Sequence, residues 1–492
     1  MVTAPAHVQP ASTNTYVTAT VALDHIAASA AHASNPIAPK NAIDLDRPSA
    51  HAIPSGSPPR LKHLQREQAP ARLHPLRYLN YSSPVNVAQL KLELAQHPDR
   101  QKVDFVVYGL ESGFRLKVRP DARLKAAVKN CRSSCEHPAV IDEYLAKESK
   151  LGRIAGPFDH LPHSKLQISR FGVIPKKSSG DWRLILDLSH PEGFSVNDGI
   201  DPDKCHMHYC KVDDAIRLIM AEGKGARMAK LDINSAYRII AVHPDDHDLL
   251  GMKWRNKYYI DLALPFGLRS APFIFNSVAD MLEWILRHNY GISDLMHYLD
   301  DYFTVGPPSS EQCNHNLLTI KETCNQLRIP LAPEKCVGPT TCIVFLGIEL
   351  DSIELCARLP GDKLSELRSL LETWLGKKSC TRRELESLVG KLQHASTVVK
   401  PGRTFLRRRF DGLRGIRRPN HYHRLSRECK LDIMWWNELL ANLNGVFFFD
   451  CPEWEPAPDM HISLDASGKL GYGVFHNIEW FSGSPGSYVY YL

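Results

Sequence analysis

Two adjacent carboxylates, Asp300 and Asp301, lie in the stretch HYLDDYFTVG, which is otherwise apolar and aromatic enough for a buried β-hairpin. Like charges repel, and removing them from water is costly, so such a pair needs a counter-charge such as a bound cation. Successive residues of a strand point to opposite faces, so both carboxylates can serve one site only at or near a tight turn. We therefore expect residues 295–306 to form a hairpin whose turn lies at the acidic pair.

A third carboxylate, Asp232, ends the apolar run MAKLD. Three carboxylates on adjacent strand ends would form a hard oxygen site suited to Mg²⁺, with Mn²⁺ as the alternative ion. Two such ions can activate an attacking hydroxyl and neutralise a leaving pyrophosphate. They would also offset the repulsion between Asp300 and Asp301. The spacing alone leaves both this reading and a purely structural one open.

Strand patterns surround the three carboxylates. Residues 171–189 predict a hairpin whose turn is the Ser-Ser-Gly sequence in its middle. Residues 228–242 begin as a strand and then turn helical, and residues 342–351 (CIVFLGIELD) predict one further strand. We expect these elements to position the site.

Helical patterns cover residues 270–288 and much of the chain after residue 360. Ser270 is the expected cap of the first helix, with Pro272 in its first turn. Thr381 and Glu384 form a capping box ahead of a later apolar face. Two more helices are expected from the shared face of Leu364, Leu367, Leu371 and Trp374, and around Trp435–Leu443.

The composition is that of a large globular chain with one strongly basic strip. Its 492 residues are 43% hydrophobic, enough for several cores, so two to four domains are expected. Residues 401–430 hold nine Arg and one Lys against two acidic residues, a balance of +8 compared with +6 for the whole chain. Such a strip suits a phosphate backbone, although a solvated helix face fits the charge equally well.

The cysteines and the hydropathy pattern predict a soluble intracellular protein of the cytoplasm or nucleus. The twelve cysteines are scattered and no secretory signal precedes them, so reduced thiols are expected. The segment CHMHYC (205–210) crowds its four candidate ligands into one place and lacks the second pair of a usual zinc site, so ordinary side chains are expected there. No apolar run is long enough to span a bilayer, so no membrane partner is expected.

Five motifs occur in a fixed order: IPKKSSGDWRLILDLS, LDINSAYR, LPFGLRSAPFIFN, YLDDY and FLGIELD. The set resembles the reverse transcriptases of retroelements, closely over roughly residues 165–350. The flanking GRIAGPF, SVNDGI and SLVGKLQHASTVVKPGRTFLRR look like the DIRS-type retrotransposons, which bear a tyrosine recombinase, and extend the likeness to about residues 80–492. The resemblance implies an α+β right-hand polymerase with fingers, palm and thumb, followed by an incomplete RNase H-like α/β domain.

The resemblance also implies roles for single residues. Asp232, Asp300 and Asp301 would be catalytic and would hold two metal ions. Tyr237 would lie under the incoming sugar and exclude a 2′-hydroxyl. The other nucleotide contacts would be Lys176, Lys177 and Arg183 on the triphosphate, Phe266 and Gly267 of PFGL against nucleotide and template, and Lys335 at the departing pyrophosphate.

The implied reaction is RNA-directed DNA synthesis. Its partners are an RNA or DNA template-primer and deoxynucleoside triphosphates, and the primer 3′-hydroxyl is the nucleophile. Arg403, Arg407, Arg408 and Arg409 of the basic strip would contact the nucleic acid. No feature of the sequence specifies an oligomeric state.

The tail sequence ISLDASGKLGYGVF resembles the first strands of an RNase H domain, with Asp465 as one metal ligand. The later acidic ligands of that family would lie beyond Leu492, so RNase H activity is not expected of this truncated chain. The expected domains are a disordered leader (1–75), a small α/β lead-in (76–150), fingers and palm (151–355), a helical thumb or connection (356–450) and the RNase H-like segment (455–492).

Two rival functions remain open at this point. A catalytically inactive, element-derived protein that binds nucleic acid would explain the basic strip and the truncated tail, but it has no need of intact carboxylates. A ribonuclease acting through Asp465 in a longer form of the chain would lack its remaining ligands here.

Overall fold

The computed structural model describes residues 76–124, 129–175, 182–406, 420–442, 447–448, 462–467, 471–476 and 479–483. Two compact units divide between Leu355 and Cys356. This division coincides with the boundary drawn from the sequence at residue 355. The leader expected over residues 1–75 lies outside the described residues, as does the turn of the first hairpin.

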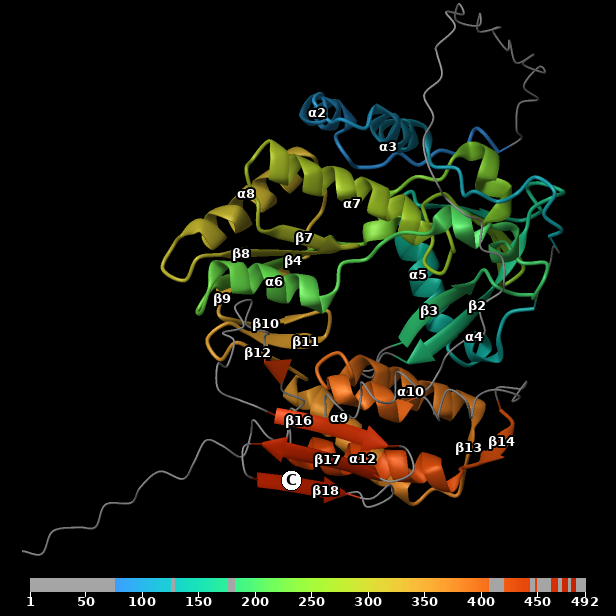
Figure 1. The fold of residues 1–492 in the computed structure, drawn as a ribbon. Coiled ribbons are helices and arrows are strands. Elements are labelled where there is room, and N and C mark those ends of the chain that lie inside the picture. The colour runs from blue at the N-terminus through green and yellow to red at the C-terminus, as the bar shows by residue number, and fades with distance from the viewer. Residues whose placement is uncertain are drawn as a thin grey trace, which may run out of the picture. The chain divides into compact units, whose positions relative to one another are not determined.

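A four-stranded antiparallel sheet carries the three carboxylates (Figure 1). Its order is β7 (Leu295–Tyr298), β8 (Asp301–Gly306), β4 (Arg227–Asp232) and β9 (Val337–Thr340). Strand β8 lies in the middle of the core, since Tyr302 and Phe303 are at most 1% exposed. A strand buried on both faces has a continuous apolar run, which explains the sequence YFTV directly after the acidic pair.

Helices α6 (Val212–Glu222), α7 (Ala271–His288) and α8 (Gln312–Gln326) pack against this sheet. Helix α7 begins after Ser270 and has Pro272 in its first turn, as expected. The expected side-chain cap is wrong, however, because the Ser270 hydroxyl donates instead to the carbonyl oxygen of Leu116, 2.8 Å away. The hydroxyl thus donates to a buried carbonyl oxygen far away in the sequence and does not accept from the first backbone N–H groups of its helix.

A second sheet has the order β1-β6-β5-β2-β3. Strands β2 and β3 form the expected hairpin, with Pro175 opposite Trp182. Strands β2 and β5 are parallel, and the other pairs are antiparallel. The strands are β1 (Ile154–Phe158), β2 (Ile168–Pro175), β3 (Trp182–Asp187), β5 (Gly251–Trp254) and β6 (Lys257–Asp261).

The lead-in, expected to be mixed α/β, is helical. Its helices are α2 (Val87–Glu93), α3 (Arg100–Ser112), α4 (Arg132–Glu136) and α5 (Pro138–Lys150). The strand-like pattern of GFRLKV yields only isolated bridges at Phe114 and Val118. Phe114 and Leu116 are at most 1% exposed. Burial of alternate residues in the core thus produces a strand pattern where no strand forms.

The stretch CIVFLGIELD forms two strands, so the prediction of one strand is wrong. Strands β10 (Cys342–Phe345) and β11 (Ile348–Asp351) pair antiparallel, with Phe345 opposite Ile348. The two residues between them, Leu346 and Gly347, have φ angles of +47° and +78°. Two positive φ angles are typical of the tight hairpin turns that glycine favours.

The unit after residue 355 contains the expected helices and a separate three-stranded sheet. Helices α9 (Gly361–Leu375), α10 (Arg382–Ala395) and α12 (Arg427–Asn442) are present, and α12 begins earlier than its sequence pattern predicted. The Thr381–Glu384 capping box before α10 is confirmed. The strands are β12 (Cys356–Arg358) with β15 (Phe447–Phe448), β13 (Ser379–Thr381) with β14 (Tyr422–Arg424), and the meander β16 (Ile462–Ser467), β17 (Gly471–His476) and β18 (Glu479–Gly483).

Candidate active site

The three carboxylates meet where strand β4 ends and strand β8 begins. Asp232 is the last residue of β4 and lies directly opposite Asp301, the first residue of β8. Tyr298 pairs with Asp301, so the hairpin turn consists of Leu299 and Asp300. Leu299 has a φ angle of +54°, a strained conformation for a bulky side chain. The expected hairpin, with its turn at the acidic pair, is confirmed.

The site concentrates negative charge in a partly buried environment. Asp232 is 7% exposed, and Asp300 and Asp301 are half-buried. Burial, together with the neighbouring carboxylates, raises the pKa of Asp301 to about 6. Burial and the charge of Asp232 also raise the pKa of Asp300. The carboxylates therefore lack sufficient positive charge around them, which is the electrostatic demand inferred from the sequence.

Lys335 supplies part of that positive charge. It ends the short 3₁₀ helix η5 (Pro333–Lys335), and its Nζ lies 2.9 Å and 3.0 Å from the two carboxylate oxygens of Asp232. This hydrogen-bonded pair raises the pKa of Lys335. The backbone N–H of Ala332 donates to the Asp232 carbonyl oxygen at 2.9 Å and fixes η5 beside the strand end.

The carboxylates supply the oxygen ligands of a metal site, but their side chains are not arranged around a common point. In the described part of the chain, no three His, Cys, Asp or Glu side chains converge closely enough to hold an ion as they stand. Metal binding would require Asp232 to exchange its contact with Lys335 for a contact with the ion. The oxygen donor set and its unbalanced charge suit Mg²⁺.

Two aromatic residues expected at the nucleotide lie against each other. Tyr237, in the 3₁₀ helix η3 (Ala236–Ile239), has its ring centroid 5.0 Å from that of Phe266. The buried Phe275 of α7 lies 5.6 Å away on another side of the Tyr237 ring. Phe266 is 59% exposed, so this wall faces solvent on one side. Burial and the nearby charge of Asp300 raise the pKa of Tyr237 well above its usual value.

Asn197 holds the loop that contains Phe266, a role that sequence reasoning missed. Its side-chain amide donates to the Gly267 carbonyl oxygen at 2.9 Å and accepts from the backbone N–H of Arg269 at 2.7 Å. Gly267 has a φ of +88°, a conformation that explains its glycine. Asn197 lies in the motif SVNDGI, but its partners are about 70 residues away and only the fold reveals them.

Arg238 ties the Tyr237 segment to the strand that leads to Phe266. It is 3% exposed, and its guanidinium lies 2.9 Å from a Glu148 oxygen and 2.8 Å from an Asp261 oxygen. It also donates to the carbonyl oxygen of Ala263 at 3.1 Å. Complete burial outweighs the guanidinium and raises the pKa of Asp261 to about 6. No local pattern in the sequence identifies this buried ion cluster.

The remaining predicted contacts lie on other elements or outside the described residues. Arg183 is exposed on β3, opposite Ile174, whereas Lys176 and Lys177 fall outside the described residues. Arg403 is exposed in the 3₁₀ helix η6 (Lys400–Leu406). Arg407, Arg408 and Arg409 also fall outside the described residues, and Asp465 is an exposed residue of β16 opposite Gly473.

The cysteines in the described part of the chain form no disulfide bonds and are free thiols. His206 and His208 of CHMHYC lie with their ring centroids 5.3 Å apart, and no metal cluster forms around them among the described residues. Within the same residues, no helix has the length and apolar character needed to cross a membrane.

A family comparison covers the site directly. Residues 174–350 match the family described as "Reverse transcriptase (RNA-dependent DNA polymerase)". These residues are a reverse transcriptase domain. All three carboxylates, the aromatic pair Tyr237 and Phe266, and Lys335 lie inside the reverse transcriptase domain. The mixed α/β fold agrees with the right-hand polymerase architecture expected from the sequence.

The similar proteins are polyproteins of retroelements and retroviruses. The retrovirus-related Pol polyprotein from transposon 412 of Drosophila melanogaster is 25% identical over 246 residues, which are 48% of this chain and 19% of that protein. The Gag-Pro-Pol polyprotein of Mason-Pfizer monkey virus is 22% identical over 325 residues, 60% of this chain and 16% of that protein. The chain thus spans less than a fifth of these polyproteins.

A solved structure, the foamy viral protease-reverse transcriptase in complex with an RNA/DNA hybrid, is also similar. Its TM-score is 0.49 at 15% identity, covering 81% of this chain and 52% of that one.

Proposed function

We propose that this protein is an RNA-directed DNA polymerase of a retrotransposon. The observation that carries the proposal is the meeting of Asp232, Asp300 and Asp301 at one end of the β4–β8 pair, inside the reverse transcriptase domain. One buried and two half-buried carboxylates that repel one another have no structural use in a sheet. Binding of cations, and through them of anionic nucleotides, would give these carboxylates a function.

In this proposal, Asp232, Asp300 and Asp301 hold Mg²⁺, or Mn²⁺ in its place. The bound ions would lower the pKa of the primer 3′-hydroxyl and neutralise the pyrophosphate that leaves. The chain itself positions the carboxylates, because the pairing of β4 with β8 holds Asp232 and Asp301 opposite each other. Lys335, released from Asp232, would remain within reach of the leaving pyrophosphate as a mobile point charge.

Tyr237 and Phe266 would form the wall against which the deoxyribose of the incoming nucleotide lies. Support comes from their ring contact and from the charge of Asp300 near the Tyr237 hydroxyl. The positive φ of Gly267 shapes the same loop against the nucleotide. Lys176, Lys177 and Arg183 of the β2–β3 hairpin would bind the triphosphate, with Arg183 as the planar fork and the lysines as point charges.

An RNA or DNA template-primer is the proposed partner, and the basic strip is the proposed contact for its backbone. Arg403 is exposed on η6, and the rest of η6 packs against α12. The Phe405 ring stacks on the Trp435 ring with centroids 3.9 Å apart, and a Cβ on Gly402 would meet the Trp436 ring. An anchored segment presents its cations at little further entropic cost. Arg407, Arg408 and Arg409 continue the strip in the sequence.

Three finer assignments belong to the proposal. The motifs GRIAGPF and SVNDGI support a position near the DIRS-type elements. The β16–β18 meander with Asp465 supports an RNase H-like segment. The free thiols of the described residues support an intracellular site of action, in the cytoplasm or nucleus.

Primer extension by the purified chain tests the proposal. Asp300→Asn should abolish extension on RNA and DNA templates and leave template-primer binding nearly unchanged, because it removes a metal ligand and no phosphate contact. The matched control is Asp213→Asn, which alters an exposed residue of another Asp-Asp pair in α6 and should extend normally. Extension by Asp300→Asn at near the wild-type rate would remove this residue from the catalytic site.

A further inference from the structure

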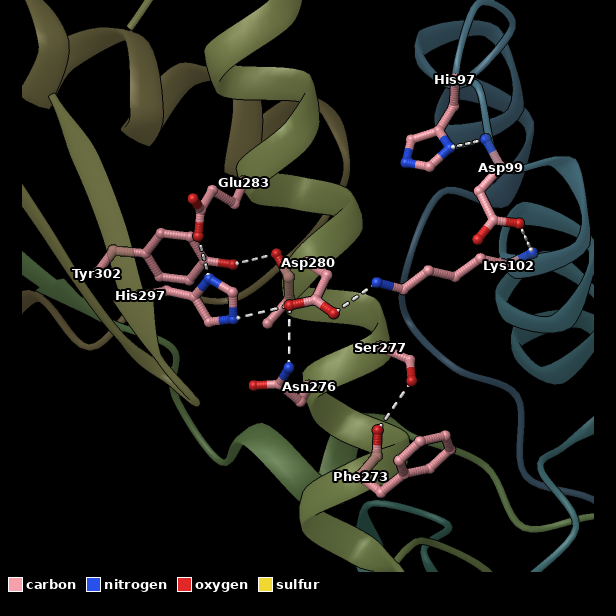
Figure 2. A network of polar contacts seen from close by, with 11 residues as sticks. His97, Asp99, Lys102, Phe273, Asn276, Ser277, Asp280, Glu283, His297 and Tyr302 are labelled. Atoms are coloured by element: carbon pink, nitrogen blue, oxygen red, sulfur yellow. Dashed lines mark hydrogen bonds and ion pairs between the residues drawn. The ribbon is translucent and has the colours of Figure 1, made fainter. Parts of the chain in front are cut away.

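A partly buried ion cluster lies beside the hairpin that carries Asp300 and Asp301 and consists of Lys102, Asp280, Glu283 and His297 (Figure 2). His297 is in β7, three residues before Asp300, and its side chain is 6% exposed. Its Nδ1 lies 2.5 Å from a Glu283 oxygen, and its Nε2 lies 3.4 Å from an Asp280 oxygen. Both ring nitrogens therefore face carboxylates of α7.

His297 can donate to both carboxylates only if it is protonated. A neutral imidazole has one N–H and could donate to only one of the two carboxylates. Burial lowers the pKa of His297, but the hydrogen bonds to Asp280 and Glu283 outweigh burial and raise it to about 9. The other cations are Lys102, 2.7 Å from Asp280, and Arg287, 2.8 Å from Glu283. His297 is the buried member of these pairs, so its removal leaves the two carboxylates without the donor that faces both of them.

The hairpin is attached to its surroundings at further points. In the described part of the chain β7 is an edge strand that pairs with β8, Arg287 of α7 donates to the Leu295 carbonyl oxygen, and the Tyr298 ring lies 5.0 Å from the Tyr209 ring. The turn that follows holds Leu299 at a strained positive φ. On β8, Tyr302 donates its hydroxyl to the Ala279 carbonyl oxygen at 2.9 Å, and its ring stacks on His297 with centroids 5.3 Å apart. Both strands of the hairpin are thus fastened to the same turn of α7.

The cluster also reaches a helix outside the reverse transcriptase domain. Lys102 belongs to α3, and Figure 2 shows its side chain extending from that helix to Asp280. The His97 ring lies 4.7 Å from the Trp284 ring, and Asn289 donates to the Glu93 carbonyl oxygen at 2.8 Å. The lead-in helices are therefore joined to α7 at several points along its length.

We propose that His297 is a positioning residue that braces the catalytic hairpin against α7, and that Lys102 extends this brace to α3. The brace keeps the Leu299–Asp300 turn in the conformation that presents Asp300 and Asp301 to the metal ions. Its effect on the reaction rests on the proposed polymerase function, whereas its effect on the mobility of the hairpin does not.

The test compares His297→Gln with the wild-type chain in two measurements. The first is single-nucleotide incorporation, where kcat should fall about 10- to 100-fold, because small displacements of catalytic groups have effects of this size. The KM for the nucleotide and the Kd for template-primer should stay within about twofold, since His297 contacts neither. Lys102→Met should also lower kcat, but less than His297→Gln does.

The second measurement is hydrogen exchange of the metal-free chain, which needs no activity. Peptides covering residues 295–306 should exchange faster in His297→Gln, and peptides covering α10 should not change. Lys91→Met is the matched control, because Lys91 makes a comparable ion pair with Glu111 within the lead-in but does not reach α7. It should leave both measurements at wild-type values.

The outcomes separate the brace from the proposed function. An inactive wild-type chain whose hairpin nevertheless exchanges faster in His297→Gln would contradict the polymerase and support the brace. Unchanged exchange over residues 295–306 in His297→Gln would overturn the brace. A parallel loss of kcat, template-primer affinity and α10 protection would also overturn it, because His297 would then support the fold as a whole.

Discussion

Tyr237→Val should relax the discrimination between deoxynucleotides and ribonucleotides. The Tyr237 ring packs against the Phe275 ring with centroids 5.6 Å apart, which limits how far it can move toward the core. Phe275 is itself only 1% exposed and belongs to the core. A 2′-hydroxyl placed against this wall would therefore meet a ring with limited room to move toward the core. Valine would open the space that the ring fills.

The size of the effect follows from the energy of overpacking. Forcing an extra group into a closely packed site costs about 1–3 kcal/mol. Since about 1.4 kcal/mol corresponds to a factor of ten, the wall supplies a preference of about 5- to 150-fold. Tyr237→Val should remove most of this factor by raising ribonucleotide use, with a smaller change for deoxynucleotides.

Single-nucleotide insertion with each sugar measures the effect as a ratio of two kcat/KM values. Tyr237→Phe is the control, since it keeps the ring and should keep the discrimination. If Tyr237→Val lowers both efficiencies in parallel and leaves their ratio unchanged, Tyr237 is a packing residue and the reasoning about the sugar fails.

Three further predictions concern charge. Folding raises the pKa of Asp301 to about 6, so the metal-free chain loses stability as the pH rises from about 4 through 6. Asp301→Asn should therefore raise the melting temperature in Mg²⁺-free buffer more at pH 7.5 than at pH 5. An equal shift at both pH values would contradict this. Arg238→Met leaves Glu148 and Asp261 buried without their main counter-charge, so urea unfolding should show a free energy of unfolding lower by about 3–5 kcal/mol. In the control Arg153→Met, which removes a longer contact of 3.6 Å with Glu148, the free energy of unfolding should fall much less. Arg407→Ala combined with Arg408→Ala should reduce the slope of log affinity against log salt by roughly two units, and an unchanged slope would mean that the strip faces solvent.

The carboxylate site could be predicted because its determinants are local. Asp232 ends an apolar run, and the acidic pair interrupts another, so the strand ends and the turn are both visible in the sequence. The Thr381–Glu384 capping box is likewise a contact between residues three positions apart. Each of these features is visible within a short stretch of sequence, whereas the meeting of Asp232 with the acidic pair depends on the pairing of β4 with β8.

The supporting contacts could not be predicted because their partners are distant in the chain. Arg238 meets Glu148 ninety residues away, and Ser270 bonds to Leu116 rather than to its own helix. The β10–β11 turn failed for a different reason. Leu346–Gly347 is too short and too apolar to interrupt a hydrophobic run, and only the positive φ angles mark it as a turn.

The central claim is tested most directly by the wild-type chain extending a primer on an RNA template with one deoxynucleotide and Mg²⁺, with pyrophosphate counted alongside the product. The account predicts one pyrophosphate released for each nucleotide added, and neither product in Asp232→Asn. A wild-type chain that binds the template-primer but releases no pyrophosphate would contradict the account, and would leave a nucleic-acid-binding protein whose carboxylates do no chemistry.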